Sequence, residues 1–259
     1  LRLAIGSVLA VTYAGNAISS SLPVAGSGVG TSFTYRQFSA RGAPGTTSAW
    51  VLTVAGIISS TAFALILSVG AIHSGNPAAV IAGAAGAAAT VVPLSAVLVG
   101  LRRPRTRDWL IRLVVWAVSQ VQRRTGRPVG DPGEIVRAAI AQLGELRLSR
   151  RDAVMASIFS LTNWAFDIAC LVCAVKATGG SVPSKGIILA WAAGAGAASL
   201  NLTPGGLGVV EAALAAALVA IGLRSTPAMT SVLVYRFISF WLILAVGWMA
   251  YWAIRRRPN

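Results

Sequence analysis

Charged side chains inside apolar stretches are the residues of this sequence that could carry chemistry. Asp167, Glu211 and Arg236 fall well inside such stretches, and Arg36 lies near the edge of one. An ionisable group is costly in lipid, so it usually faces a polar pathway or another charge. Glu211 and Arg236 lie at a similar offset from the starts of adjacent apolar segments. This spacing predicts an ion pair between them.

Two roles are open for these charges. The Glu211–Arg236 pair could be purely stabilising. In the alternative, Arg36 or Arg236 holds an anionic headgroup, while Glu211 tunes the site or contacts an amine. Asp167, beside Asn163 and Thr162, either lines the same cavity or bonds a neighbouring helix.

Enzymatic chemistry is not expected within this chain. No Ser/His/Asp set and no carboxylate pair is placed for hydrolysis, and the single histidine, His73, argues against a histidine-built metal site. Cys170 and Cys173 form a C-x-x-C inside an apolar run, where they are interpreted as small packing residues and not as a redox pair. No cofactor is predicted.

Composition places the chain in a membrane. Of 259 residues, 56% are hydrophobic and only 11% are charged, with a mean hydropathy of +0.73, whereas a soluble domain carries about 25% charged residues. The 22 basic and 7 acidic residues give a net charge of +15, which would suit nucleic acid or an anionic surface. The positions of the basic residues decide between the two.

A spanning helix needs about 20 mostly apolar residues, and the sequence predicts an all-α, polytopic membrane helix bundle of about six such helices in one transmembrane domain, 1–259. The predicted spans are Leu3–Leu22, Thr46–Ile72, Pro77–Leu101, Asp152–Ala177, Pro183–Leu202 and Pro227–Ile254.

Two further stretches, Pro23–Arg36 and Pro204–Gly222, are apolar but broken by Pro and Gly. Their freed backbone groups must be buried in protein or line a polar cavity, and two clustered motifs favour a cavity. The short helix after Pro204–Gly208 would present its positive N-terminus there, a natural seat for a phosphate. Glycines outside the clusters are interpreted as helix-packing positions: Gly83, Gly86, Gly194 and Gly196.

The polar connection 101–151 predicts the orientation. It is rich in arginine and contains two amphipathic patterns, Trp109–Val121 and Glu134–Leu148, expected to lie at the membrane interface. With the Arg36/Arg41 loop and the tail Arg255–Arg257, it places 17 of the 22 basic residues on segments that the positive-inside rule assigns to the cytoplasm. The charge therefore indicates topology and anionic lipid, not nucleic acid. For the tail to be cytoplasmic, Pro204–Gly222 must run outward, which favours a crossing over a re-entrant loop.

The two broken stretches share an order of features, which predicts two inverted repeats, 1–72 and 183–254; chance similarity is the alternative. Paired interruptions of this kind indicate a transporter site near the bilayer midplane. The candidate ligand-binding residues are Asn16, Pro23, Gly26, Gly28, Gly30, Tyr35, Arg36, Asp167, Asn201, Pro204, Gly205, Gly206, Gly208, Glu211, Tyr235 and Arg236.

These motifs resemble a known family. Pro204–Glu211 followed by Leu233–Phe237 is similar to the second signature of the flippase-like transmembrane domain of lysylphosphatidylglycerol synthases and their stand-alone, UPF0104-like relatives, and Asn16–Arg36 resembles the first. Many relatives carry a carboxylate where this chain has Thr31 and Ser32. Members of the family usually begin with two further transmembrane helices, which are expected to be absent here. No aminoacyl-transferase domain is expected after Asn259, so lipid aminoacylation is not expected of this chain alone.

What the resemblance implies is a bacterial inner-membrane, multi-pass transporter that moves a charged phospholipid or glycolipid headgroup, anionic or aminoacylated, between leaflets. One alternative is a non-transporting scaffold or accessory subunit that positions a partner synthase through the 102–151 surface. Another is an integral-membrane transferase acting on lipid-linked substrates, which the missing carboxylate pair disfavours.

Overall fold

A computed structural model describes residues 4–75, 149–183 and 185–256, with the single positions 80, 81, 88 and 112. Every regular element of this part of the chain is helical. The predicted span Pro77–Leu101 and both predicted interfacial helices of the connection fall outside the described ranges, apart from those four positions. Many large apolar side chains lie on the protein surface, among them Phe159, Phe166 and Phe237, as expected where lipid replaces water.

Within the described ranges, three helices are long and apolar enough to cross a membrane. They are α3 (Gly45–Ser74), α7 (Arg150–Ala177) and the continuous stretch Ser225–Arg256, which comprises α10 (Ser225–Arg236), the π-helical segment η2 (Phe237–Leu242) and α11 (Ile243–Arg256). Local sequence sets their ends: Ser149 caps α7 by accepting a hydrogen bond from the Asp152 N–H, and Gly75 ends α3 in a left-handed conformation. The sequence predicted all three spans.

The remaining helices form two hairpins of short antiparallel helices. In the first, α1 (Ile5–Ser21) turns at Leu22–Ala25 into α2 (Gly26–Ala40). In the second, α8 (Ile187–Ser199) is joined to α9 (Val209–Ala220) by a break that contains the 3₁₀ turn η1 (Pro204–Gly206). With 13 and 12 residues, α8 and α9 are each about 20 Å long, less than the roughly 30 Å of a hydrocarbon core.

The lengths of α8 and α9 therefore favour a re-entrant hairpin, in which the chain returns to the side of the membrane from which it entered, over the predicted crossing. Gly186 at the start of α8 packs beside Ile221 at the end of α9, and Gly194 packs beside Leu214, so the helices run antiparallel and their outer ends meet. The predicted span Pro183–Leu202 is the entering arm of this hairpin. Leu3–Leu22, also predicted to be a span, is the entering arm of the first hairpin.

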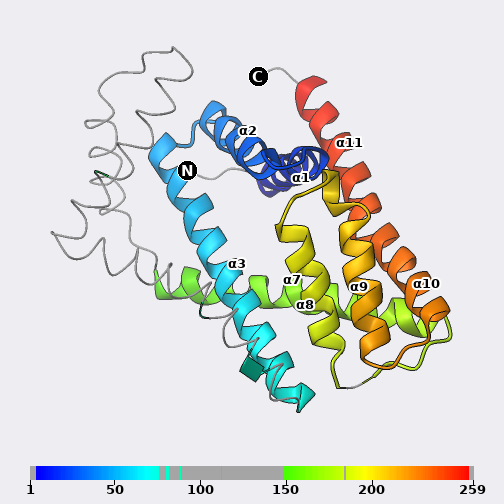
Figure 1. Ribbon diagram of the computed structural model, residues 1–259. Coiled ribbons are helices and arrows are strands. Elements are labelled where there is room, and N and C mark those ends of the chain that lie inside the picture. Colours follow the sequence, from blue (N-terminus) through cyan, green and yellow to red (C-terminus); the bar gives the residue numbers. More distant parts are fainter. Residues whose placement is uncertain are drawn as a thin grey trace.

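The hairpins enter from opposite ends of the bundle. Ala4, Arg41 and Arg256 line one pocket, so the first hairpin opens at the end where α11 finishes. At the other end, Gly70 of α3 contacts Ile188 of α8, and Thr178 after α7 hydrogen-bonds Ser231 of α10. The break between α8 and α9 lies beside α1, and α7 crosses behind α8 and α9 (Figure 1).

The best-packed part of the described chain surrounds Trp191 of α8, which is 1% exposed. Its ring packs against Phe63 of α3 and Trp164 of α7, while Leu171, Leu214 and Val232 bring in α7, α9 and α10. This core holds the second hairpin against all three long helices, and so fixes the position of the break that it carries.

Candidate functional site

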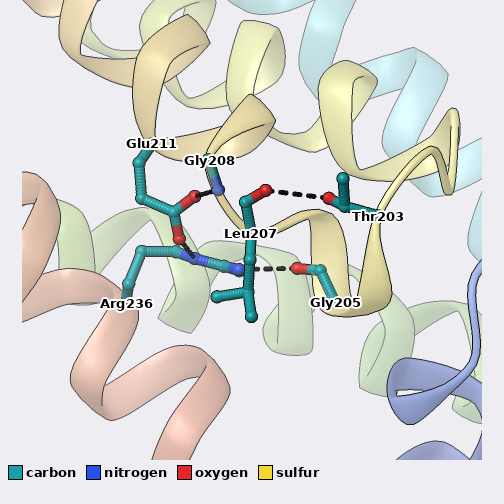
Figure 2. Close-up of polar contacts among 6 residues, drawn as sticks. All are labelled: Thr203, Gly205, Leu207, Gly208, Glu211 and Arg236. Carbon is teal, nitrogen blue, oxygen red and sulfur yellow. Dashed lines mark hydrogen bonds and ion pairs between the residues drawn. The ribbon is translucent and has the colours of Figure 1, made fainter.

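The predicted ion pair between Glu211 and Arg236 is formed. Arg236 Nε lies 2.6 Å from Glu211 Oε1, and Arg236 Nη2 donates to the carbonyl oxygen of Gly205 at 2.6 Å. Arg236 is only 7% exposed. The arginine, on α10, thus binds both the break that precedes α9 and the first turn of α9 (Figure 2).

Glu211 also caps the helix to which it belongs. Its second carboxylate oxygen, Oε2, accepts a hydrogen bond of 2.6 Å from the Gly208 N–H, the N-cap of α9. A carboxylate in the first turn favourably meets the positive end of the helix dipole. The sequence predicted this N-terminus as a seat for a phosphate, but the side chain of Glu211 already occupies the Gly208 donor.

The break between α8 and α9 depends on glycine at three positions. Gly205, Gly206 and Gly208 have φ of 61°, 68° and 83°, a region that residues with a Cβ rarely adopt. A Cβ on Gly205 would also overlap the ring of Phe240. A hydrogen bond of 2.8 Å from Thr203 Oγ1 to the Leu207 carbonyl closes the turn (Figure 2).

The π-helical segment places an aromatic ring beneath the buried arginine. Phe240 lies within η2, and its ring centroid is 4.4 Å from the Arg236 Cζ, a cation–π distance. Single π-helical turns are often found at functional sites. The break and the last long helix are therefore packed together through Arg236, which contacts both Gly205 and Phe240.

Asp167 bonds neighbouring helices. It accepts hydrogen bonds from Trp191 Nε1 at 2.8 Å and from the Tyr235 hydroxyl at 3.0 and 3.1 Å. Of the two alternatives left open by the sequence, the structure shows the contact with neighbouring helices, joining α7, α8 and α10. Tyr235 is thus the partner of Asp167, next in sequence to the arginine that holds Glu211.

The turns of the two hairpins touch each other. The Val24 N–H donates a hydrogen bond of 2.9 Å to the carbonyl oxygen of Asn201. Both residues have positive φ, 55° at Val24 and 48° at Asn201, which is an outlier for a β-branched residue such as valine. Val24, which follows Pro23 in the first half, therefore contacts Asn201, which precedes Pro204 in the second half. The backbone of Val24 is strained at this contact.

The glycines of the first motif do not form a loop. Gly26, Gly28 and Gly30 lie in the first turns of α2, where Gly26 and Gly30 permit a close approach to α1: a Cβ on either would overlap the Ser19 backbone or side chain. This small-residue spacing is typical of tight helix packing. Asn16 is an exposed residue in the middle of α1, whereas Asn201 lies in the break, so the two asparagines are not at corresponding places.

Arg36 and Tyr35 lie apart from the Glu211–Arg236 pair. They line an open groove between α2 and α3, with a volume of about 540 Å³. Arg36 is exposed and has neither an ion pair nor a hydrogen bond to the described residues. The sequence grouped Arg36 with Arg236 as headgroup contacts, but of these two only Arg236 has a partner among the described residues.

Sequence reasoning missed four residues of this region: Val24, Trp191, Thr203 and Phe240. Two of them had a signal. Phe240 stands four residues after Arg236, the spacing of neighbours on a helix, and a buried tryptophan generally needs a partner for its N–H, which Asp167 supplies.

Cys170 and Cys173 are both free thiols. Within the described ranges, no group of acidic, histidine or cysteine side chains could hold a metal.

The chain is similar to a described protein family and to a membrane protein of an archaeon. The family model described as "Lysylphosphatidylglycerol synthase TM region" matches residues 1–247. A UPF0104 membrane protein of Pyrococcus horikoshii is 28% identical over 104 residues, which cover 39% of this chain and 31% of the relative. The match thus spans about a third of that relative's length. No solved structure matches significantly.

Proposed function

Because the chain belongs to the lysylphosphatidylglycerol synthase TM region family, we propose that it is a lipid transporter that moves the charged headgroup of a phospholipid or glycolipid between the two leaflets of a membrane. The observation that carries the proposal is the meeting of two interrupted hairpins, from opposite ends of the bundle, through the Val24–Asn201 hydrogen bond. Interrupted helices that meet inside a membrane are the usual setting of a transport site.

The contact between the hairpins supports a mechanism in which they separate. A hydrogen bond joins two residues with positive φ. Asparagine tolerates this region, whereas for the β-branched Val24 such backbone strain costs about 1–3 kcal/mol. Opening the contact releases that strain, which offsets part of the cost of the lost hydrogen bond. The closed contact blocks the route between the hairpins, and the open contact lets a headgroup pass.

The Glu211–Arg236 pair would couple this contact to a long helix. Arg236 binds the Gly205 carbonyl and Glu211, so the break and α9 follow any movement of α10. In this role the pair transmits motion and Arg236 does not itself hold the headgroup. The stabilising role that the sequence left open is compatible with this one.

The layout also supports the inverted repeat. In each half a hairpin is followed by a long helix that starts at the end from which the hairpin enters: α1–α2 then α3, and α8–α9 then α10–α11. The second set runs opposite to the first. We place the end that carries Arg41, Arg255 and Arg256 in the cytoplasm of a bacterial cell, at the inner membrane, because arginine-rich ends are retained there.

Leaflet exchange of a fluorescent phospholipid in proteoliposomes tests the proposal. Purified wild-type protein should accelerate exchange over protein-free liposomes. Gly206→Leu, Glu211→Gln and Arg236→Ala should reduce it, because each disrupts the break or its anchor. Gly196→Leu is a matched control, since a Cβ at Gly196 meets open space. Exchange at the wild-type rate by all three variants would sink the proposal.

The scaffold alternative predicts a different result. A non-transporting accessory subunit would show no exchange but would co-purify with a lipid-modifying synthase. Absence of leaflet exchange by the wild type, together with co-purification that is lost when the arginines of 102–151 are neutralised, would favour the scaffold.

A further inference from the structure

The groove between α2 and α3 has the composition of a phosphate-binding site. Three hydroxyl residues and one arginine of α2 line one wall: Thr31, Ser32, Tyr35 and Arg36. The other wall, from α3, is Ala49, Leu52 and Thr53, and the Thr53 hydroxyl donates to the Ala49 carbonyl oxygen. Thr31 and Tyr35 are four residues apart, as are Ser32 and Arg36, so all four lie on one face of the helix. Hydroxyl and guanidinium groups are the usual side-chain donors to phosphate oxygens.

Arg36 is free to bind a ligand. Arg236 pairs with Glu211, donates to the Gly205 carbonyl oxygen and lies over the ring of Phe240, and Arg41 donates to Gln37. The Arg36 side chain is exposed and has no such partner in the part of the chain that the structure covers. Its planar guanidinium can therefore present two N–H groups to one phosphate.

No described acidic side chain reaches this groove. Asp152 binds Ser149, Asp167 binds Trp191 and Tyr235, and Glu211 binds Arg236 and Gly208. Glu211 is the third residue of α9, while the third residue of α2 is Gly28. An amine in the groove would thus lack a counter-charge among the described residues and would face Arg36.

The groove lies near one end of the bundle. Arg36 precedes the last residue of α2, Ala40, by four positions, which is about 6 Å along the helix axis. Ala49 and Thr53, on the opposite wall, belong to the first turns of α3. Because α3 is long and apolar enough to span a membrane, its first turns are expected near the headgroup layer of one leaflet, where a lipid would first bind.

We propose that this groove is the entry site for a lipid headgroup of net negative charge, with a phosphate on Arg36 and the hydroxyls, and that it disfavours headgroups bearing amines. The inference rests on the proposed function only for identifying a lipid as the cargo. Of the two classes of lipid that the sequence left open, anionic and aminoacylated, the groove would bind the anionic one.

Equilibrium binding to the full chain in phosphatidylcholine nanodiscs tests the site without requiring transport. Fluorescent short-chain phosphatidylglycerol is the probe, and unlabelled phosphatidylglycerol, lysyl-phosphatidylglycerol and inorganic phosphate are competitors. Lysyl-phosphatidylglycerol, which carries a net positive charge, should compete at least tenfold more weakly than phosphatidylglycerol. Inorganic phosphate should compete poorly, and equal competition by it would show a site for free phosphate and overturn the lipid assignment.

Substitutions locate the binding in the groove. Arg36→Ala should weaken phosphatidylglycerol binding at least tenfold, and Arg36→Lys should restore part of it because the charge is kept. Arg224→Ala, which removes an exposed arginine at the other end of the bundle, should leave binding unchanged. Undiminished binding by Arg36→Ala, or equal affinity for the lysyl lipid, would refute the proposal.

A gain of function completes the test. Thr31→Glu adds a carboxylate to the exposed face of α2, so it should weaken phosphatidylglycerol binding and strengthen lysyl-phosphatidylglycerol binding; an unchanged preference counts against the site. Thermal unfolding of each variant checks its folding. Intact selective binding with no leaflet exchange would overturn the proposed transport alone, and exchange without charge selectivity would overturn this inference alone.

Discussion

Arg236 is held inside the bundle by partners from three parts of the chain. Glu211 supplies the opposite charge, Gly205 a carbonyl oxygen and Phe240 an aromatic face. Because both charges are largely desolvated, with side-chain exposures of 9% for Arg236 and 15% for Glu211, removing one partner leaves the other buried and unpaired.

A double-mutant cycle measures the effect on stability. Glu211→Gln should lower the free energy of unfolding by about 3 kcal/mol, the low end for breaking a buried pair. Glu211→Gln with Arg236→Met should recover much of this loss, because no charge is then left unpaired. Denaturant or thermal unfolding in detergent is the measurement, and a single variant as stable as the wild type would show that the pair is not buried in the membrane protein.

The sequence predicted the pair but not its surroundings. A charge in an apolar segment has few possible partners other than an opposite charge in a neighbouring segment. Glu211 and Arg236 could therefore be paired without a structure. The Gly205 carbonyl and Phe240 reach Arg236 through a left-handed turn and a π-helical segment, which depend on tertiary packing. Asp167 could be recognised as a charge in an apolar segment, but its partners could not be predicted, since Trp191 and Tyr235 lie on other helices.

At the scale of elements, the first hairpin depends on close contact between α1 and α2. Gly30 lies against Gly15 and Ser19 of α1, where a Cβ would overlap both. Gly28, two residues earlier on α2, faces open space.

These two glycines provide a matched pair of substitutions in one helix. Gly30→Ala should destabilise the protein by about 1–3 kcal/mol through overpacking. Gly28→Ala should be neutral or slightly stabilising, because alanine favours the helix. Thermal unfolding in detergent distinguishes them, and equal effects would contradict the packing of α1 on α2.

Hydropathy located the long helices but not the hairpins. The predicted spans Thr46–Ile72 and Asp152–Ala177 end within two residues of α3 and α7, because length and apolarity suffice to define a crossing helix. The same criteria cannot tell a crossing from an arm that turns back, since both are apolar. For α8 and α9 the return is set by packing between Gly186 and Ile221 and between Gly194 and Leu214, which links residues distant in sequence.

At the scale of the whole molecule, the hairpins enter from opposite ends. Lys185 precedes α8 and Arg224 follows α9, so both should lie on one side of the membrane, with Arg256 on the other. In a background with Cys170 and Cys173 replaced, a membrane-impermeant maleimide should label Lys185→Cys and Arg224→Cys from the same side and Arg256→Cys from the opposite side. Labelling of Lys185→Cys and Arg224→Cys from opposite sides would disprove the second hairpin.

We propose that lipid passes when the two hairpin turns separate. Leaflet exchange by Val24→Cys/Asn201→Cys in the same cysteine-free background is the measurement that tests it, because the native residues are joined by a backbone hydrogen bond and a disulfide between them would hold the two turns together. We predict that exchange stops when the two cysteines are oxidised to a disulfide and returns on reduction, while either single variant is unaffected by oxidant. Exchange at an unchanged rate by the fully cross-linked protein would contradict the account.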